Sequence, residues 1–280
     1  MKQFLIENGV PFEGDFIKLP PWCKRIKIDI GLSDCAIHSK IWLGKDKNMF
    51  NDLVVFGFEP SPENIKRLKD PLIVDKKKID PALIGKNFFL IPCAIGNVGP
   101  NEVLPTADLY ITPKPTECTI VHQGSLHHTG VEDSDSDSDS EEKKTSKKGI
   151  NIPAVYTKKI SVPIWSLNHF LQYIPFGTGI IPPIIDYVKI DCCGSELDVL
   201  HGAQRYLNKI AIMTVSPSDK YNIIYFLERN NFIEYKHGDN SLPKPYESFS
   251  ILPTYFNKAL IGAIQSRFIT YYQIGLLGEN

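Results

Sequence analysis

Acidic residues stand at the ends of three short apolar segments of this chain, and carboxylates in such places can bind a ligand or take a proton from it. Asp29 ends the segment RIKID, Glu59 follows VVFGF, and Asp191 follows VKI. In open α/β sheets, ligands bind beyond the carboxyl ends of the strands, where the amides of loops and helix N-termini converge. An acid after the second strand can accept hydrogen bonds from both hydroxyls of a ribose. The three acids therefore predict a ligand-binding crevice.

The loop after Asp29 reads D-I-G-L-S-D and contains a glycine where a backbone would meet a ligand. Gly31 has no side chain, so the main chain can approach a ligand closely at this point. The loop is not G-x-G-x-x-G and lacks the glycine-lined cradle of a dinucleotide pyrophosphate. A phosphate-free nucleoside ligand fits better. A nucleotide-dependent oxidoreductase stays as an alternative, with the missing glycine pattern against it.

These acids need strands and helices to hold them. Short apolar runs bounded by turn residues predict strands at residues 26–30, 53–58, 88–93, 187–190, 210–215 and 232–235. Apolar positions at three- and four-residue spacing after a capping or first-turn residue predict helices at residues 62–69, 196–207 and 220–231. This alternation favours βαβ units and an α/β fold with a Rossmann-like, doubly wound, mostly parallel sheet.

The bulk composition excludes several classes of partner. The chain has 280 residues with 31 basic and 32 acidic side chains, so no global field points to nucleic acid or to an anionic membrane. A small or neutral partner is expected, bound by a single domain over residues 1–280. The six cysteines show no C-x-x-C spacing and no stretch approaches a membrane-spanning run, which favours a reduced, cytoplasmic protein. Nothing in the sequence indicates an oligomeric state.

Residues 131–149 interrupt the α/β pattern with seven acidic residues, four lysines and one apolar residue. So little apolar surface cannot offset the entropy of ordering, which predicts a disordered acidic loop. The loop is either a tolerated insertion or an acidic tract that binds proteins or is phosphorylated. His122, His127 and His128 precede it without a cysteine or carboxylate at a recognisable ligand spacing, so no metal site is predicted.

Four motifs in a fixed order carry a family resemblance. They are a strand with D-x-G, a strand with E-P-x-P-E-N, the segment P-x-A-I-G-N, and V-K-I-D-x-x-G-S-E-L-D-V-L-x-G-A. Together they resemble the FkbM-like family of methyltransferases that depend on S-adenosyl-L-methionine. The resemblance covers about residues 25–207 and implies a seven-stranded, mostly parallel sheet with one antiparallel strand near the C-terminus.

The resemblance also implies which residues bind S-adenosylmethionine. Asp29 and Gly31 would lie against the methionine end of the cofactor, and Ser33 stands in the same loop at the family's asparagine position. Glu59 would hold the ribose, and Ala94 would border the adenine. The first loop departs from the commoner D-x-G-A-N-x-G form and is similar to the form of a subgroup.

Catalysis would depend on the last motif. Asp191 would face the reaction centre, as a cofactor contact and as a candidate base for a hydroxyl acceptor. Glu196 is a second candidate by position, or else only a first-turn acid favoured by the helix dipole. His38 is a third candidate base, because an imidazole titrates near neutral pH; the alternative is a histidine on a helix surface with no catalytic role. Cys193 stands where the family often has a glutamate.

The resemblance implies methylation of a sugar or other small-molecule hydroxyl. Because positioning the acceptor supplies much of the acceleration of methyl transfer, few groups are needed beyond a base. The altered first loop and Cys193 motivate an alternative, a catalytically inactive relative that binds the cofactor or proteins.

Overall fold

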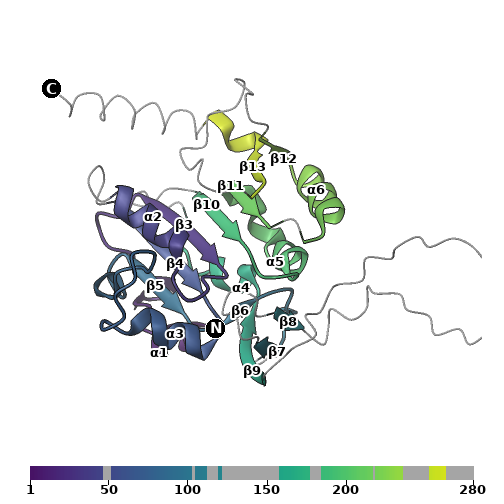
Figure 1. The fold of residues 1–280 in the computed structure, drawn as a ribbon. Helices are drawn as coiled ribbons and strands as arrows, with labels where there is room; N and C mark the ends of the chain where they lie inside the picture. The colour runs from purple at the N-terminus through teal and green to yellow at the C-terminus, as the bar shows by residue number, and fades with distance from the viewer. Residues whose placement is uncertain are drawn as a thin grey trace, which may run out of the picture.

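A computed structural model describes residues 1–46, 52–102, 105–111, 119–121, 158–176, 184–216, 218–235 and 252–262. The described part is a mixed α/β fold with a large, mostly parallel sheet, as the sequence predicts (Figure 1). The predicted acidic loop, residues 131–149, lies outside the described residues. No helix in the described part is both long enough and apolar enough to cross a bilayer.

The central sheet of the described residues has the strand order β12-β13-β11-β10-β3-β4-β5. Adjacent strands from β11 to β5 are parallel, and β13 is antiparallel to both of its neighbours. The strands span Arg25–Ile30 (β3), Leu53–Phe58 (β4), Phe88–Ile91 (β5), Ile185–Ile190 (β10), Ile210–Val215 (β11), Phe232–Glu234 (β12) and Thr254–Asn257 (β13).

Both faces of the sheet are covered, which explains why its strands read as continuous apolar runs rather than as alternating ones. Every residue of β3, β4, β5 and β11 is buried. One apolar cluster joins the sheet to α1, α4, α5 and α6, and another joins its opposite face to α2 and α3. These helices span Lys2–Glu7 (α1), Ile37–Asp46 (α2), Pro62–Lys69 (α3), Leu167–Leu171 (α4), Glu196–His201 (α5) and Lys220–Arg229 (α6).

The predicted helix at 62–69 is confirmed as α3, where Ser61 caps the first turn and Pro62 occupies its first position. The predicted helix at 196–207 is wrong in its second half. It ends at His201 and gives way to a 3₁₀ helix, Gln204–Lys209. The helix ends just before Gly202, a poor helix former, and a Cβ there would lie 2.2 Å from the Gly96 carbonyl oxygen, so the position has room only for glycine.

A second sheet, of which sequence analysis gave no sign, lies beside the central one. Its order is β6-β9-β7-β8, with β7 antiparallel to β8 and β9. The strands are Ala94–Ile95 (β6), Thr106–Ile111 (β7), Thr119–Val121 (β8) and Lys158–Trp165 (β9). The predicted strand at 88–93 accordingly ends early, at Ile91, before the chain enters β6. A short hairpin, β1 (Phe12–Glu13) and β2 (Phe16–Ile17), precedes both sheets.

Candidate functional site

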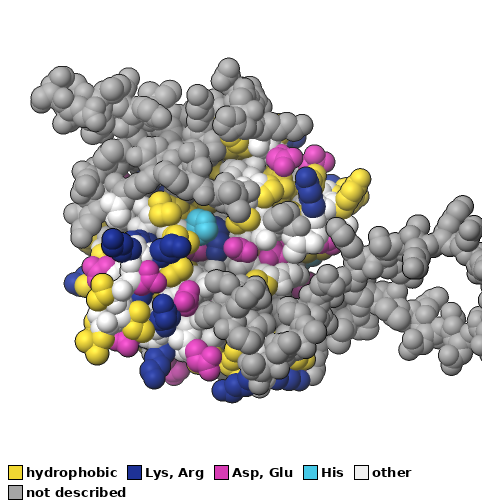
Figure 2. Space-filling model, in the orientation of Figure 1, with side chains coloured by type: hydrophobic (Ala, Val, Ile, Leu, Met, Phe, Trp, Pro, Cys, Tyr) yellow, Lys and Arg dark blue, Asp and Glu magenta, His cyan; other side chains and the backbone are white. Residues whose placement is uncertain are grey.

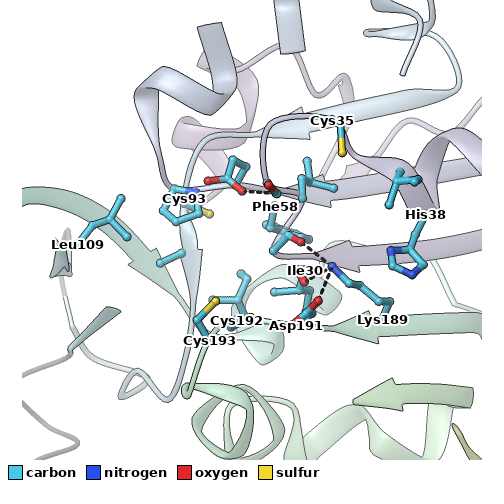
Figure 3. Close-up of a pocket in the computed structure, with 18 residues that line it drawn as sticks. Ile30, Cys35, His38, Phe58, Cys93, Leu109, Lys189, Asp191, Cys192 and Cys193 are labelled. Carbon is cyan, nitrogen blue, oxygen red and sulfur yellow. Dashed lines mark hydrogen bonds and ion pairs between the residues drawn. The ribbon is translucent and has the colours of Figure 1, made fainter. Parts of the chain in front are cut away.

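A pocket opens at the carboxyl edge of the central sheet, where β3, β4 and β10 end at the same level. Their register pairs Ile30 with both Phe58 and Ile190. The residues that directly follow the three strands line one cavity of about 220 Å³: Gly31, Glu59 and Asp191 (Figure 3). Parallel register therefore gathers residues that are 28 to 160 positions apart along the chain.

The structure brings most of the sequence-predicted site residues to this pocket. The lining includes Gly31, Ser33, His38, Glu59, Ala94 and Asp191. Asp29 and Glu196 do not line the pocket. Both are almost fully buried behind the pocket wall. Asp29 contacts Lys189 and Glu196 contacts Cys192, and these two residues do line the pocket.

Much of the remaining lining is apolar. Leu109 of β7 contributes to it, so the second sheet supplies one wall. Cys35 and Cys93 also line the pocket, and burial raises the pKa of both thiols. Both sulfurs therefore stay protonated at neutral pH and act as small apolar groups. Such a surface suits a flat, uncharged ring system.

At Gly31 the backbone that follows β3 lies against the backbone that follows β10. Its φ is +79°, and a Cβ at this position would lie 1.9 Å from the carbonyl oxygen of Asp191. The end of β10 is held there by a hydrogen bond from the Asp191 N–H to the Ile30 carbonyl, at 3.1 Å. No side chain fits between these backbones, so this position requires glycine for its conformation and for its space.

Glu59 ties the loops around the pocket together. It is 4% exposed, and its Oε2 accepts a hydrogen bond from the Ser33 N–H at 2.8 Å. Its Oε1 accepts from the Ser61 N–H at 2.9 Å and from the Asn64 side chain at 3.1 Å. Ser33 itself has a φ of +57°, a strained value that the Glu59 contact helps to hold. Burial raises the pKa of Glu59 to about 7, although these hydrogen bonds act in the opposite direction.

We expect this buried acid to make the free energy of unfolding fall as the pH rises. The pKa of Glu59 is about 7 in the folded chain against 4.5 as its ordinary value, so its contribution is complete below about pH 4.5 and is lost as the pH rises through about 7. The loss amounts to roughly 3 kcal/mol. Urea unfolding of wild type and Glu59→Gln, from about pH 5 to about pH 8, measures it. A Glu59→Gln variant that keeps the wild-type slope would contradict the assignment.

Lys189 is a site residue that sequence reasoning missed. It lines the pocket although its side chain is only 4% exposed. Its ammonium lies 3.3 Å from Asp29 Oδ1 and 4.0 Å from Asp191 Oδ2, and it donates hydrogen bonds to the backbone carbonyls of Ile30 and Gly31. The segment V-K-I-D could have revealed this residue, because a lysine inside a buried apolar strand needs an acidic or hydrogen-bonding partner.

Two carboxylates, those of Asp29 and Asp191, lie near the single ammonium of Lys189, so one negative charge is in excess. Burial lowers the pKa of Lys189, but Asp29 and Asp191 more than offset it and the pKa is raised. The lysine is therefore charged. Asp29 is 1% exposed and also accepts hydrogen bonds from the Ser39 N–H and hydroxyl, at 3.1 and 2.7 Å. Asp191 is 42% exposed, so the net negative charge faces the cavity. A positively charged ligand group is favoured there.

Glu196 organises the turn that follows Asp191. It is fully buried, and its Oε1 accepts from the Cys192 N–H at 2.8 Å while its Oε2 accepts from the Gly194 N–H at 3.0 Å. The Ser218 hydroxyl also donates to this carboxylate. Between the two amides, Cys193 adopts a φ of +53°. Glu196 thus acts on the pocket by positioning this turn, not by facing the cavity.

His38 reaches the pocket from the first turn of α2. It is half-buried, and its ring centroid lies 6.4 Å from that of Trp42. Within the described residues, no group of three histidine, cysteine or acidic side chains is placed to hold a metal ion. His122, His127 and His128 lie outside those residues.

The fold and the pocket define a Rossmann-like α/β protein with a candidate ligand site at the carboxyl edge of the sheet, between Glu59 after β4 and Asp191 after β10. Residues 39–257 match the family model described as the methyltransferase FkbM domain. The chain therefore belongs to the family of FkbM methyltransferase domains.

Two further comparisons add little to this assignment. No curated protein matches the sequence. Among solved structures, the chain is similar to the crystal structure of methyltransferase FkbM from Methylobacillus flagellatus, with 14% identity and a TM-score of 0.40. The match covers 89% of this chain and 47% of that one, so this chain spans about half its length.

Proposed function

We propose that this protein is an S-adenosylmethionine-dependent methyltransferase that transfers the methyl group to a hydroxyl of a sugar or other small molecule. The observation that carries the proposal is the convergence of Gly31, Glu59 and Asp191 on one pocket at the ends of three parallel strands. The strand order, with β13 antiparallel, supports it, because the family resemblance implies such a sheet.

The residues of the pocket fit the cofactor. S-adenosylmethionine supplies an activated methyl group on a positively charged sulfur. The excess carboxylate of Asp191 suits that charge. The Glu59 carboxylate accepts three hydrogen bonds from the chain and has one acceptor site left, on Oε2, for a ribose hydroxyl. Ala94 is buried in the apolar part of the lining, where an adenine ring would pack. Gly31 lines the cavity without a side chain, so its backbone can lie close to a ligand there.

The residues of the chain would orient the acceptor hydroxyl and accept its proton. Asp191 is the base that the geometry favours, because its carboxylate is half exposed to the cavity. His38 lines the same pocket and is the second candidate. Glu196 is assigned a positioning role, since its carboxylate is committed to the turn at Cys192 and Gly194.

Calorimetric titration separates the candidate functions. The full chain is titrated with S-adenosylmethionine, S-adenosylhomocysteine and NAD, and we expect binding of the first two only. Binding of NAD alone would favour the oxidoreductase. Turnover is then assayed with a panel of sugars and small hydroxyl compounds. Cofactor binding without turnover on any acceptor would favour the inactive relative, for which Cys193 is the motivating departure.

We expect Glu59→Ala to weaken the binding of S-adenosylmethionine by roughly 1–3 kcal/mol, because a buried hydrogen-bond partner of the ribose is lost. Affinity in wild type should also weaken as the pH falls below about 7, where Glu59 takes up a proton. Glu63→Ala, at an exposed position in the first turn of α3, is the matched control and should bind as wild type does. Equal affinity of Glu59→Ala and wild type would refute the ribose assignment.

A further inference from the structure

The loop that follows α3 carries two apolar side chains that are almost fully exposed. Leu72 is 87% exposed and Val74 is 94% exposed, and Pro71 beside them is exposed as well. Exposed apolar residues are common one at a time, but two at the tip of one short loop form a small projecting surface.

Within residues 66–77, five basic side chains stand against two acidic ones. Lys66, Lys69, Lys76 and Lys77 are all exposed. The two acids of the same segment are engaged within it. Asp70 accepts a hydrogen bond from the Leu72 N–H at 2.9 Å. Asp75 accepts one from the Lys77 N–H at 2.8 Å and also lies 3.6 Å from Arg67. On the left of Figure 2, basic, acidic and apolar side chains lie next to one another over the region where Figure 1 draws α3 and β5.

The loop is anchored to the first loop of the candidate site. Arg67 pairs with Asp34 at 3.1 Å, and the Ile79 N–H donates to the Cys35 carbonyl at 2.9 Å. Lys40 of α2 also donates to the Lys76 carbonyl. Asp34 stands between Ser33 and Cys35, which both line the pocket. The projecting tip and the pocket are therefore parts of one connected surface region.

We propose that residues 66–77 dock the protein on an anionic phospholipid surface. Leu72 and Val74 would enter the boundary between headgroups and acyl chains, while the flanking lysines would bind lipid phosphates and carboxylates. The near-neutral charge of the whole chain gave no reason to expect this, and the inference depends on the exposure of Leu72, Val74 and the lysines beside them. Docking of this kind needs no membrane-spanning helix and does not rest on the proposed methyltransferase activity.

Sedimentation of the full chain with vesicles tests the proposal. Vesicles of phosphatidylcholine alone are compared with vesicles that also contain about 30% phosphatidylserine, since anionic lipid is the expected ligand. We expect binding only to the second kind, and weaker binding as salt is raised towards about 1 M. Lys76→Glu with Lys77→Glu should reduce the affinity about ten- to hundredfold. Leu72→Ser with Val74→Ser should reduce it about tenfold.

The chain offers matched controls outside residues 66–77. Tyr221 and Tyr225 of α6 are 90% and 60% exposed, and Lys24 and Lys220 are exposed lysines. Tyr221→Ser with Tyr225→Ser, and Lys24→Glu with Lys220→Glu, should leave vesicle binding unchanged. The proposal is overturned if wild type does not bind the anionic vesicles, if it binds phosphatidylcholine equally well, or if the control variants lose binding to the same extent. All substituted side chains are exposed, so circular dichroism should show unchanged folding.

Discussion

Replacing Gly31 with alanine should lower the free energy of unfolding by about 3–5 kcal/mol. The new Cβ would lie 1.9 Å from the Asp191 carbonyl oxygen, a distance that only a shift of the β3 or β10 end can relieve. Such a shift would break the hydrogen bond from Asp191 to Ile30 and displace the pocket wall. Urea unfolding measures the loss, and the same variant should bind S-adenosylmethionine weakly or not at all.

A second glycine provides the control for backbone strain. Gly85 has a φ of +81°, almost the value of +79° at Gly31, but a Cβ at Gly85 would meet nothing within 4 Å. Gly85→Ala therefore measures only the cost of placing alanine at a positive φ, which is about 1 kcal/mol of the free energy of unfolding. The difference between the two variants isolates the steric conflict at Asp191. If Gly31→Ala cost no more than Gly85→Ala, the two strand ends could not be as close as the structure places them.

Replacing Lys189 with methionine should destabilise the fold by about 3–5 kcal/mol, because the carboxylate of Asp29 would remain buried without its cation. The ion pair measures 3.3 Å, and the two side chains are 4% and 1% exposed. Methionine has nearly the shape of the lysine stem, so packing is largely kept. The loss should therefore come from charge and from the hydrogen bonds to the Ile30 and Gly31 carbonyls.

Asp29→Asn tests that explanation when it is combined with Lys189→Met. Asparagine can still accept hydrogen bonds from Ser39 but leaves no buried charge. The double variant should be more stable than Lys189→Met alone, since neutral replacement of both partners of a buried pair is often tolerated. Urea unfolding of the four chains gives the coupling energy directly. Additive losses would show that the two residues do not form the pair described here.

The sequence was sufficient for the features that depend on local pattern. Continuous apolar runs predicted the buried strands, and Pro62 as a first-turn residue predicted where α3 begins. The positions of Glu59 and Asp191 after such runs predicted that both would lie at one edge of a parallel sheet. These inferences need only neighbouring residues, because the carboxyl ends of parallel strands meet wherever the strands themselves form.

Tertiary structure alone decided the features that depend on side-chain direction and on distant contacts. Glu196 and Asp191 are similar acids five residues apart, yet one turns inward to backbone amides and the other faces the cavity. Residues 196–207 were predicted as one helix, but the helix ends just before Gly202, where the distant Gly96 carbonyl leaves no room for a side chain. Lys189 has its role only because Asp29 lies on the neighbouring strand. The sequence thus determined which residues follow the strands, whereas only long-range packing determined which of them share one cavity and one set of charges.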